Sequence, residues 1–218
     1  SLMRLASSIN IPVPQTWYVD NPPALPVDLH ELPYPIVLKP ARSWLQANGR
    51  WLHTSVRFAD TPQQAKAILQ SHVEFQSHPF MIQECVPGNG QGIFALYENG
   101  KALAFFAHRR LREKPPRGGV SVLSESIPPS PTLLSHPPPL LDHAHWHRIA
   151  MVEFKVAGDE HYLMEINTRF WGSLQLAIDA GVDFPHMLYQ ISMGNKLEPV
   201  NDYKTGIRLR WLLGDIDN

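Results

Sequence analysis

The sequence predicts an α+β fold, in which helices and strands are mixed without a strict strand–helix–strand repeat. Two stretches, 92–111 and 151–167, have the alternating apolar residues and the central turn residues of β-hairpins. Segments with helix-capping residues lie between and after them, for example at Thr61 and Pro62. This irregular succession favours an α+β domain over a parallel α/β sheet.

The first third of the chain is predicted to build a small sheet with one long helix. Thr61 is expected to cap a helix over 61–75, with Pro62 as its first helical residue. The proline-rich segment 21–35 is expected to be an irregular connection. The other predicted elements are a helix over 2–9 and strands over 35–41, 51–58 and 79–86.

The rest of the chain is predicted to be dominated by the two hairpins. The first is expected to turn at Asn99–Gly100, a pair that suits a two-residue turn. The segments 112–119 and 127–139 are expected to be loops, because both contain several prolines. Helices are predicted over 141–150, 173–182 and 183–194. A break near residues 80–90 predicts two subdomains, 1–83 and 84–218.

The composition excludes several classes of protein. The net charge of -1 argues against a nucleic-acid partner, because such surfaces are usually basic. No apolar run approaches the ~20 residues of a membrane span, so no membrane association is expected. The single cysteine excludes an internal disulfide. No signal peptide is visible, and a cytoplasmic protein is predicted.

The second hairpin is predicted to place two carboxylates opposite one another. A three-residue loop over 158–160 keeps both faces of the hairpin in order, because it pairs Phe154 with Met164. The same register puts Glu153 opposite Glu165. A two-residue loop would exchange the faces, and burial of the apolar face forbids that.

Opposed carboxylates repel each other unless another charge offsets the repulsion. A divalent cation would do so, and Asn167, on the same strand face as Glu165, offers an amide oxygen as a further ligand. Ligation by oxygen alone suits Mg²⁺. Arg169, two residues further on, would then be placed to hold a phosphate. A solvated hairpin with incidental charges is the alternative.

Four segments in chain order carry a resemblance to a known family. They are "PIVLKPA", "MIQECVPGNGQG", "AHRRLREKPPRGGVS" and "MVEFK…HYLMEINTRFWGS…AGVDFP". Together they resemble the ATP-grasp superfamily of ligases, and most closely its carbamoyl phosphate synthetase large-subunit-like branch. The resemblance covers about residues 5–215 and implies two α+β subdomains with a nucleotide cleft between them.

The resemblance implies a role for individual residues in binding ATP and a metal. The ligands of Mg²⁺ or Mn²⁺ would be Glu153, Glu165 and Asn167. Lys39 would hold the α- and β-phosphates. The hinge between the subdomains would bind adenine through main-chain groups of Gln83, Glu84, Cys85 and Val86.

Three arginines are the catalytic candidates that the resemblance implies. Arg169 would lie by the phosphates or the acyl-phosphate, and Arg109 and Arg110 would contact the phosphates or the acceptor. The implied enzyme is an ADP-forming ligase that joins a small-molecule carboxylate to an amine, or to a thiol, through an acyl-phosphate. Members of the family usually carry a Rossmann-like domain ahead of this region. The resemblance therefore implies that the chain is a fragment.

Some features depart from the family pattern and keep two alternatives open. The segment 41–55 contains one glycine where many members have a glycine-rich lid, and residues 89–91 lack the carboxylate that usually binds ribose. A catalytically degenerate ATP-binding module is therefore one alternative. A hydrolase with a metal at His143, His145 and His147 is another, less favoured one, in which His143 and His147 would share a helix face.

Overall fold

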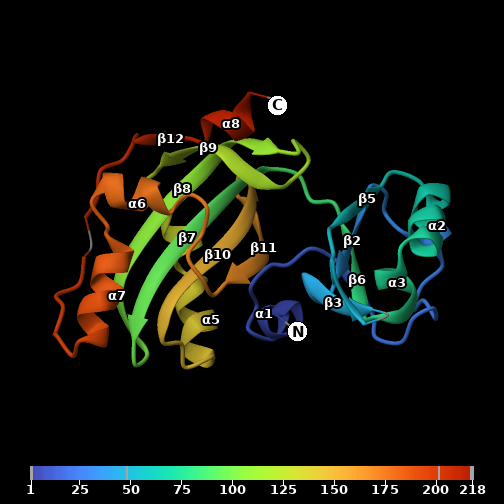
Figure 1. Cartoon of the computed structure of the whole chain (residues 1–218), viewed down its shortest axis with the longest axis horizontal. Coiled ribbons are helices and arrows are strands. Elements are labelled where there is room, and N and C mark those ends of the chain that lie inside the picture. Colours follow the sequence, from blue (N-terminus) through green and yellow to red (C-terminus); the bar gives the residue numbers. More distant parts are fainter. Residues whose placement is uncertain (1, 48, 201, 217–218) are drawn as a thin grey trace. The chain divides into compact units, whose positions relative to one another are not determined.

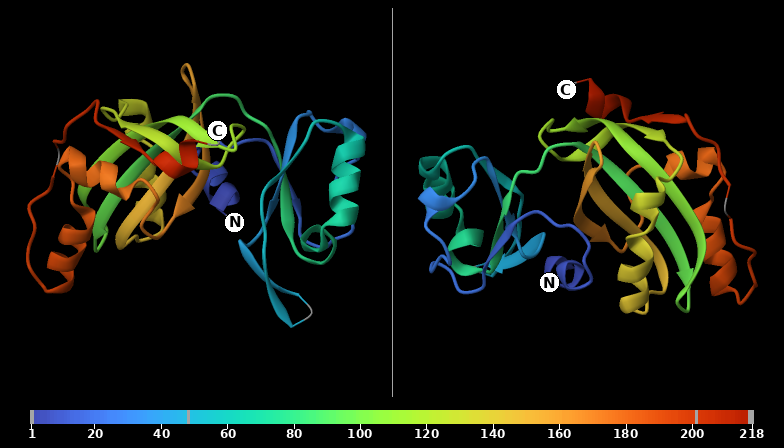
Figure 2. Two further views of the ribbon diagram at one scale, coloured as in Figure 1. Left: turned by 45° about the horizontal axis from the view of Figure 1, so that its top comes forward. Right: turned by 180° about the vertical axis from the view of Figure 1, so that it is seen from behind.

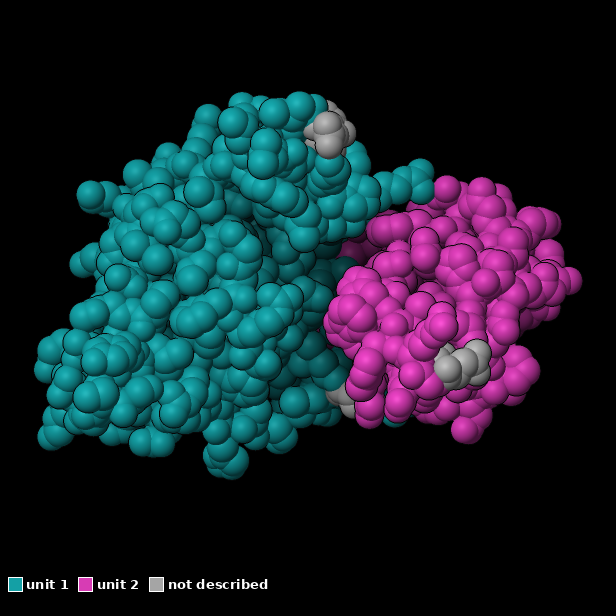
Figure 3. All heavy atoms as spheres, in the orientation of Figure 1, with its two compact units in different colours: residues 1–12, 87–218 teal, residues 13–86 magenta. Residues whose placement is uncertain are grey.

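The computed structural model describes residues 2–47, 49–200 and 202–216. The chain folds as two compact units, which Figure 3 colours separately. The smaller unit is residues 13–86, and the larger unit combines 1–12 with 87–218. The predicted boundary lies at 83/84, which places the first twelve residues in the earlier subdomain. In the structure these residues pack with the later one.

The N-terminal segment joins the larger unit through its contacts with a β-strand. Helix α1 (Leu2–Ser8) packs along strand β11 (Glu160–Asn167), and Met3 and Ala6 are buried. The N–H of Leu163 donates to the carbonyl of Pro12 at 2.8 Å. Burial of the apolar face of α1 therefore attaches the segment to a sheet more than 140 residues away in sequence.

The smaller unit is built on a four-stranded antiparallel sheet (Figure 1). Its strands lie in the order β1 (Thr16–Val19), β6 (Phe80–Glu84), β2 (Ile36–Pro40) and β5 (Arg57–Ala59). A separate hairpin is formed by β3 (Trp44–Ala47) and β4 (Arg50–His53). The remaining elements are the short helix η1 (Leu29–Glu31) and helices α2 (Pro62–Ser71) and α3 (Val73–Ser77).

Two predicted elements of the smaller unit are divided in the structure. The predicted strand over 51–58 is two strands, β4 and β5, and the hairpin partner β3 was not predicted. The predicted helix over 61–75 starts as expected, with the Thr61 hydroxyl accepting from the N–H of Gln64 at 3.3 Å. It is interrupted at His72, which has an extended backbone, and the new direction carries Phe75 into the core against Phe80.

The larger unit is built on a six-stranded sheet, shown from three sides in Figures 1 and 2. Its strand order is β11, β10 (Arg148–Ala157), β7 (Asn89–Glu98), β8 (Lys101–Lys114), β9 (Val120–Ser126) and β12 (Arg208–Arg210). Its other helices are α4 (Pro131–Leu134), α5 (Pro137–His143), α6 (Leu174–Ala180), α7 (Phe184–Ser192) and α8 (Leu212–Asp215). No helix in the described ranges is long and apolar enough to cross a membrane.

Helices cover both faces of this sheet. Helices α6 and α7 bury one face, where the ring of Trp171 lies 4.2 Å from Phe94 and 5.3 Å from Phe184, measured between centroids. Helix α5 covers the opposite face (Figure 2), with Leu140 and Leu141 buried. The predicted turn at Asn99–Gly100 is confirmed, with φ values of 49° and 79° that suit a type I′ turn.

The proline-rich segment 127–139 was wrongly predicted to exclude helix. Helix α4 starts at Pro131 and α5 at Pro137, so their prolines lie in first helical turns. Proline is tolerated there because the N–H groups of the first turn have no intrahelical partner. The predicted loop over 112–119 is also shorter than expected, because β8 continues to Lys114.

Candidate functional site

The hairpin of β10 and β11 opposes the two predicted metal carboxylates. Glu153 pairs with Glu165, and Met151 pairs with Asn167, as the sequence predicts. The route to this register differs from the prediction, because the turn leaves only Gly158 and Asp159 unpaired and a bulge follows Glu153.

The bulge corrects the pairing that the short turn would otherwise impose. Phe154 pairs with Leu163, not with Met164 as predicted, and Met164 is the extra residue of β11. Because β11 has one extra residue at Met164, the residues after it face the opposite side of the sheet from the one that the turn alone would give them. The carboxylates of Glu153 and Glu165 therefore reach the same face although the turn has two residues.

Glu153 lies in a buried and charged environment. Burial raises the pKa of Glu153 to about 7, while Arg110 acts in the opposite direction and the carboxylates of Glu165 and Glu113 add to the rise. Arg110 Nη2 donates to Glu153 Oε2, and only 10% of the Arg110 side chain is exposed. Burial disfavours the charged form of this carboxyl, so a positive group beside it stabilises the carboxylate, and Arg110 supplies one.

Glu165 and Asn167 are joined to each other on β11. Asn167 Nδ2 donates to Glu165 Oε1 at 2.6 Å, and the Glu165 side chain is exposed. The amide nitrogen is thus committed to a carboxylate, and the amide oxygen of Asn167 is the atom with metal-binding chemistry. Two carboxylates and one amide oxygen on neighbouring strands are a donor set that fits Mg²⁺.

Two glycines of β7 leave space on the face of the sheet beside Glu153. Gly92 pairs with Glu153 and Gly90 pairs with Lys155. A Cβ atom at Gly90 would lie 2.6 Å from Glu113 Oε1 and 2.8 Å from Arg110 Cδ. Only a residue without a side chain leaves room for the arginine of β8 to cross β7 and reach β10.

A buried charge cluster results, which we define as Arg110, Glu113, Glu153 and Lys155. Arg110 Nη1 lies 3.4 Å from Glu113 Oε1, and Lys155 Nζ lies 3.9 Å from Glu113 Oε2. Sequence reasoning missed Glu113 and Lys155. The available signal was the pair of glycines two residues apart, which marks a place where side chains from flanking strands meet.

Arg109 lies on the other face of the sheet, although it is adjacent to Arg110. Its Nε donates to Glu125 Oε2 at 2.8 Å, and Arg208 Nε donates to Glu125 Oε1 at 2.9 Å. Arg109 and then Arg208 hold the pKa of Glu125 below its usual value. The structure therefore does not bring Arg109 to the face that carries Glu153.

Arg169 follows the end of β11 and is exposed. Its Nη1 donates to the carbonyl of Phe170 at 3.1 Å. The strand ends at Asn167, so alternation along the strand fixes the face of Asn167 but not that of Arg169.

The smaller unit carries the predicted phosphate-binding lysine and the hinge. Lys39 is partly buried on β2, opposite Met81 on β6. Gln83 is fully buried, and its Nε2 donates to Thr16 Oγ1 at 2.8 Å. The N–H of Glu84 donates to Gln15 and that of Cys85 donates to Pro35, both at 3.1 Å. These hydrogen bonds attach the predicted hinge strand to the rest of the smaller unit up to Cys85.

The segment that replaces the expected glycine-rich lid is the hairpin of β3 and β4. Trp44 and Trp51 are on one face of it, because Trp44 pairs with His53 and Gln46 with Trp51. Their exposed fractions are 55% and 70%. Arg50 lies on the other face and is also exposed.

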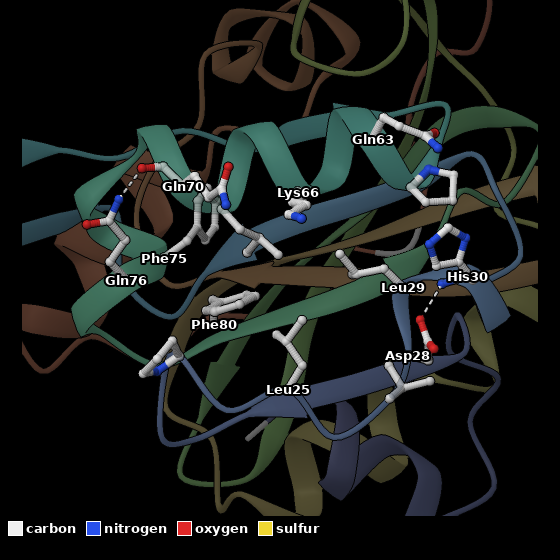
Figure 4. Close-up of a pocket in the computed structure, with 14 residues that line it drawn as sticks. Leu25, Asp28, Leu29, His30, Gln63, Lys66, Gln70, Phe75, Gln76 and Phe80 are labelled. Carbon is white, nitrogen blue, oxygen red and sulfur yellow. Dashed lines mark hydrogen bonds between the residues drawn. The ribbon is translucent and has the colours of Figure 1, made fainter.

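A separate hollow of about 780 Å³ lies within the smaller unit. Figure 4 shows it between the proline-rich segment, with Leu25 and Leu29, and the helical segment that carries Lys66 and Phe75. None of the predicted site residues lines it. The hollow is therefore distinct from both predicted parts of the ATP site.

The three clustered histidines are not held on one helix. Helix α5 ends at His143 and β10 begins at Arg148, so the predicted i,i+4 face of His143 and His147 is wrong. His147 Nδ1 accepts from the N–H of Asn99 at 3.2 Å. Within the described residues, no three His, Cys, Asp or Glu side chains are grouped as metal ligands.

The family assignment comes from comparison with known proteins. A family model described as "ATP-grasp in the biosynthetic pathway with Ter operon" matches residues 76–214, well over half of the chain. The chain belongs to this ATP-grasp family. The match includes the predicted hinge from Gln83 onward and the whole hairpin of β10 and β11, but not Lys39. Among curated proteins, no sequence matched the chain.

Solved structures show the same fold at low sequence identity. A biotin carboxylase from Campylobacter jejuni is 15% identical, with a TM-score of 0.68, over 94% of this chain and 48% of that one. A phosphoribosylamine–glycine ligase from Thermotoga maritima is 16% identical (TM-score 0.67, 94% and 56%). A D-alanine–D-alanine ligase from Bacillus anthracis, complexed with ATP, is 19% identical (TM-score 0.60, 88% and 64%).

The ATP-grasp fold is thus established for this chain. The chain spans about half to two thirds of the length of these structures.

Proposed function

We propose that this ATP-grasp protein is an ADP-forming ligase that activates a carboxylate as an acyl-phosphate and passes it to an amine. The observation that carries the proposal is the pairing of Glu153 with Glu165, beside the amide of Asn167. Opposed carboxylates repel each other, and a bound cation would add to the stabilisation that Arg110 and Asn167 give to Glu153 and Glu165. We also propose that the protein is most similar to the carbamoyl phosphate synthetase large-subunit-like branch of the superfamily.

The metal hairpin would hold Mg²⁺ through Glu153, Glu165 and the amide oxygen of Asn167. When bound, Mg²⁺ would neutralise phosphate charge during phosphoryl transfer. Two features of the hairpin would favour metal binding. Burial keeps water away from Glu153, and Asn167 orients Glu165 through its 2.6 Å hydrogen bond.

The smaller unit would supply the groups that bind the nucleotide. The ammonium group of Lys39 would contact the α- and β-phosphates, and main-chain groups around 83–86 would contact adenine. Because the N–H groups of Glu84 and Cys85 are engaged within the unit, adenine recognition falls to the other main-chain groups there, including those of Val86. Arg169, which is exposed, would meet the transferred phosphoryl group.

The chemistry asked of the protein is mainly positioning and charge stabilisation. A carboxylate oxygen of the substrate attacks the γ-phosphorus and ADP leaves, which makes an acyl-phosphate. The amine then attacks the acyl carbon, phosphate leaves, and an amide is formed. Two neighbours, those from Bacillus anthracis and Thermotoga maritima, are ligases by name.

The test compares the chain with its Glu165→Gln variant in ATP-dependent phosphate release, screened across amino acids and other carboxylates. Glu165 is exposed, so the variant should stay folded, while metal-dependent turnover should fall about 100-fold or more. Equal turnover in the two proteins would contradict the metal assignment. Nucleotide binding without acceptor-dependent ADP formation would instead identify a degenerate ATP-binding module.

A further inference from the structure

Arg110 connects two parts of the larger unit that are distant from each other along the chain. Its Nη2 donates to Glu153 Oε2 on β10, and its Nη1 donates to the carbonyl of Gly119 at 3.0 Å. The same Nη1 lies 3.4 Å from Glu113 Oε1. Because the side chain is only 10% exposed, these charge-assisted bonds are largely shielded from water and from salt.

Gly119 belongs to a tight turn between β8 and β9. The N–H of Gly118 donates to the carbonyl of Pro115 at 3.1 Å, and Gly118 has a φ of 132°. A Cβ atom at Gly119 would lie 2.2 Å from the carbonyl oxygen of Lys114. The turn has little slack, so a guanidinium that holds the Gly119 carbonyl also fixes the position of the turn.

We propose that Arg110 is a positioning residue that couples metal binding at Glu153 to the order of the turn 115–119. This inference rests on the proposed function, because it takes Glu153 as a metal ligand. A divalent cation at Glu153 takes over that carboxylate and repels the guanidinium. Arg110 then gives up Glu153 and binds Glu113 and the Gly119 carbonyl more strongly, so the turn becomes more ordered.

The neighbouring arginine provides a matched control. Arg109 lies on the opposite face with Glu125, so a change there leaves the turn and Glu153 untouched. At position 110 a lysine keeps the positive charge, but its single ammonium cannot present two parallel donors to Glu153 and Gly119 as a guanidinium does. Arg110→Lys and Arg109→Lys therefore change the same chemistry in two different places.

The experiment measures hydrogen exchange of the amides of Arg117, Gly118 and Gly119 by mass spectrometry. The conditions are no ligand, Mg²⁺ alone, and Mg²⁺ with a non-hydrolysable ATP analogue, with binding measured separately by calorimetry. Metal should slow exchange in the unaltered chain and in Arg109→Lys by roughly tenfold, the effect of one charge-assisted hydrogen bond. In Arg110→Lys exchange should be faster and should not respond to the metal.

A second variant tests the coupling without any metal. In Glu153→Gln, Arg110 has lost its carboxylate and should bind the turn as it does when the metal is present. Exchange at Gly119 should then be slow before any ligand is added. Exchange as fast as in the metal-free unaltered chain would overturn the coupling.

Different results would contradict the coupling through Arg110 and metal binding at Glu153. Metal binding that leaves exchange in the turn unchanged, or a turn in Arg110→Lys that still responds, overturns the coupling alone. Absence of metal binding by the unaltered chain, with and without the nucleotide analogue, overturns the proposed function and the coupling together.

Discussion

Arg109 and Arg110 are the same residue type at adjacent positions, but the pleat of β8 gives them opposite surroundings. Arg109, whose side chain is 49% exposed, pairs with Glu125, whose side chain is 9% exposed. Arg110 enters the buried charge cluster and is 10% exposed. An ion pair is strongly screened by water in the first place and weakly in the second.

Stability is therefore expected to depend more on the buried Arg110 than on the half-exposed Arg109. Burying ions costs free energy that only good partners offset, so removal of one partner leaves an uncompensated charge. Exposed pairs lose little when they are broken, because water replaces the partner. The two faces therefore call for matched substitutions, one on each.

The largest difference is expected when each arginine is replaced by methionine. Arg110→Met should lower the free energy of unfolding by about 3 kcal/mol, because Glu153 and Glu113 lose their guanidinium in a buried place. Arg109→Met should have a much smaller effect. Urea denaturation followed by circular dichroism measures both, and equal losses would mean that the two environments do not differ in this way.

The next largest effect concerns His108, on the same face as Arg110. Burial, and then the positive charge of Arg110, lowers the pKa of His108 to about 3. The unfolded chain takes up a proton below its ordinary pKa of about 6.5, while the folded chain stays neutral until about pH 3. The contribution of His108 to stability should therefore fall by about 1.4 kcal/mol per pH unit below pH 6.5.

This pH dependence is isolated by comparison of the chain with His108→Gln. Glu153, whose pKa is raised, contributes the opposite slope between its ordinary pKa and about pH 7, and it is present in both proteins. Denaturation midpoints measured from pH 7 to pH 4 should therefore converge as the pH falls, because only the unaltered chain loses the histidine contribution. Parallel midpoint curves would show that His108 is not held neutral.

A smaller effect is expected from a methyl group placed in the opening of the sheet. Gly90→Ala brings a Cβ atom within 2.8 Å of Arg110 Cδ, and the two flexible side chains there must move. We expect a loss of about 1 kcal/mol, at the low end for overpacking. Gly172→Ala, where nothing lies within 4 Å of the new atom, is the control in the same denaturation assay and should be close to neutral.

The smallest effect is expected on the exposed face, and it should depend on salt. Glu125→Gln leaves Arg109 and Arg208 without their carboxylate, and both are well exposed. Any change in melting temperature at low ionic strength should shrink as sodium chloride is raised toward 1 M, where the Debye length is about 3 Å. An effect that persists in high salt would place Glu125 in the same class as Glu153.

Local patterns predicted the parts of the molecule that depend on neighbours in sequence. The turn at Asn99–Gly100 and the cap at Thr61 follow from single residues. The pairing of Glu153 with Glu165 was predicted from the alternation of apolar residues, although the bulge that produces it was not. Each of these is decided within a few residues of itself.

The parts that were missed depend on residues brought together by the sheet. Glu113 lies beside Arg110 on β8, where irregularities of the strand after Arg110 shift its pairing. Lys155 of β10 reaches this cluster across β7, which is glycine at two positions. The attachment of residues 1–12 to the larger unit depends on the packing of α1 along β11. No periodicity within a segment reports such long-range contacts.

The bulge at Met164 divides the hairpin of β10 and β11 into two parts whose pairing is set independently. Between the turn and the bulge, the two-residue turn at Gly158 and Asp159 sets which residues pair. On the other side of the bulge, the register is shifted by one residue, and Glu153 pairs with Glu165 in that shifted register. An insertion near the turn that is matched by loss of the bulge would leave both carboxylates where they are. A change of one residue in the length of the turn is therefore compatible with the same pairing of Glu153 and Glu165.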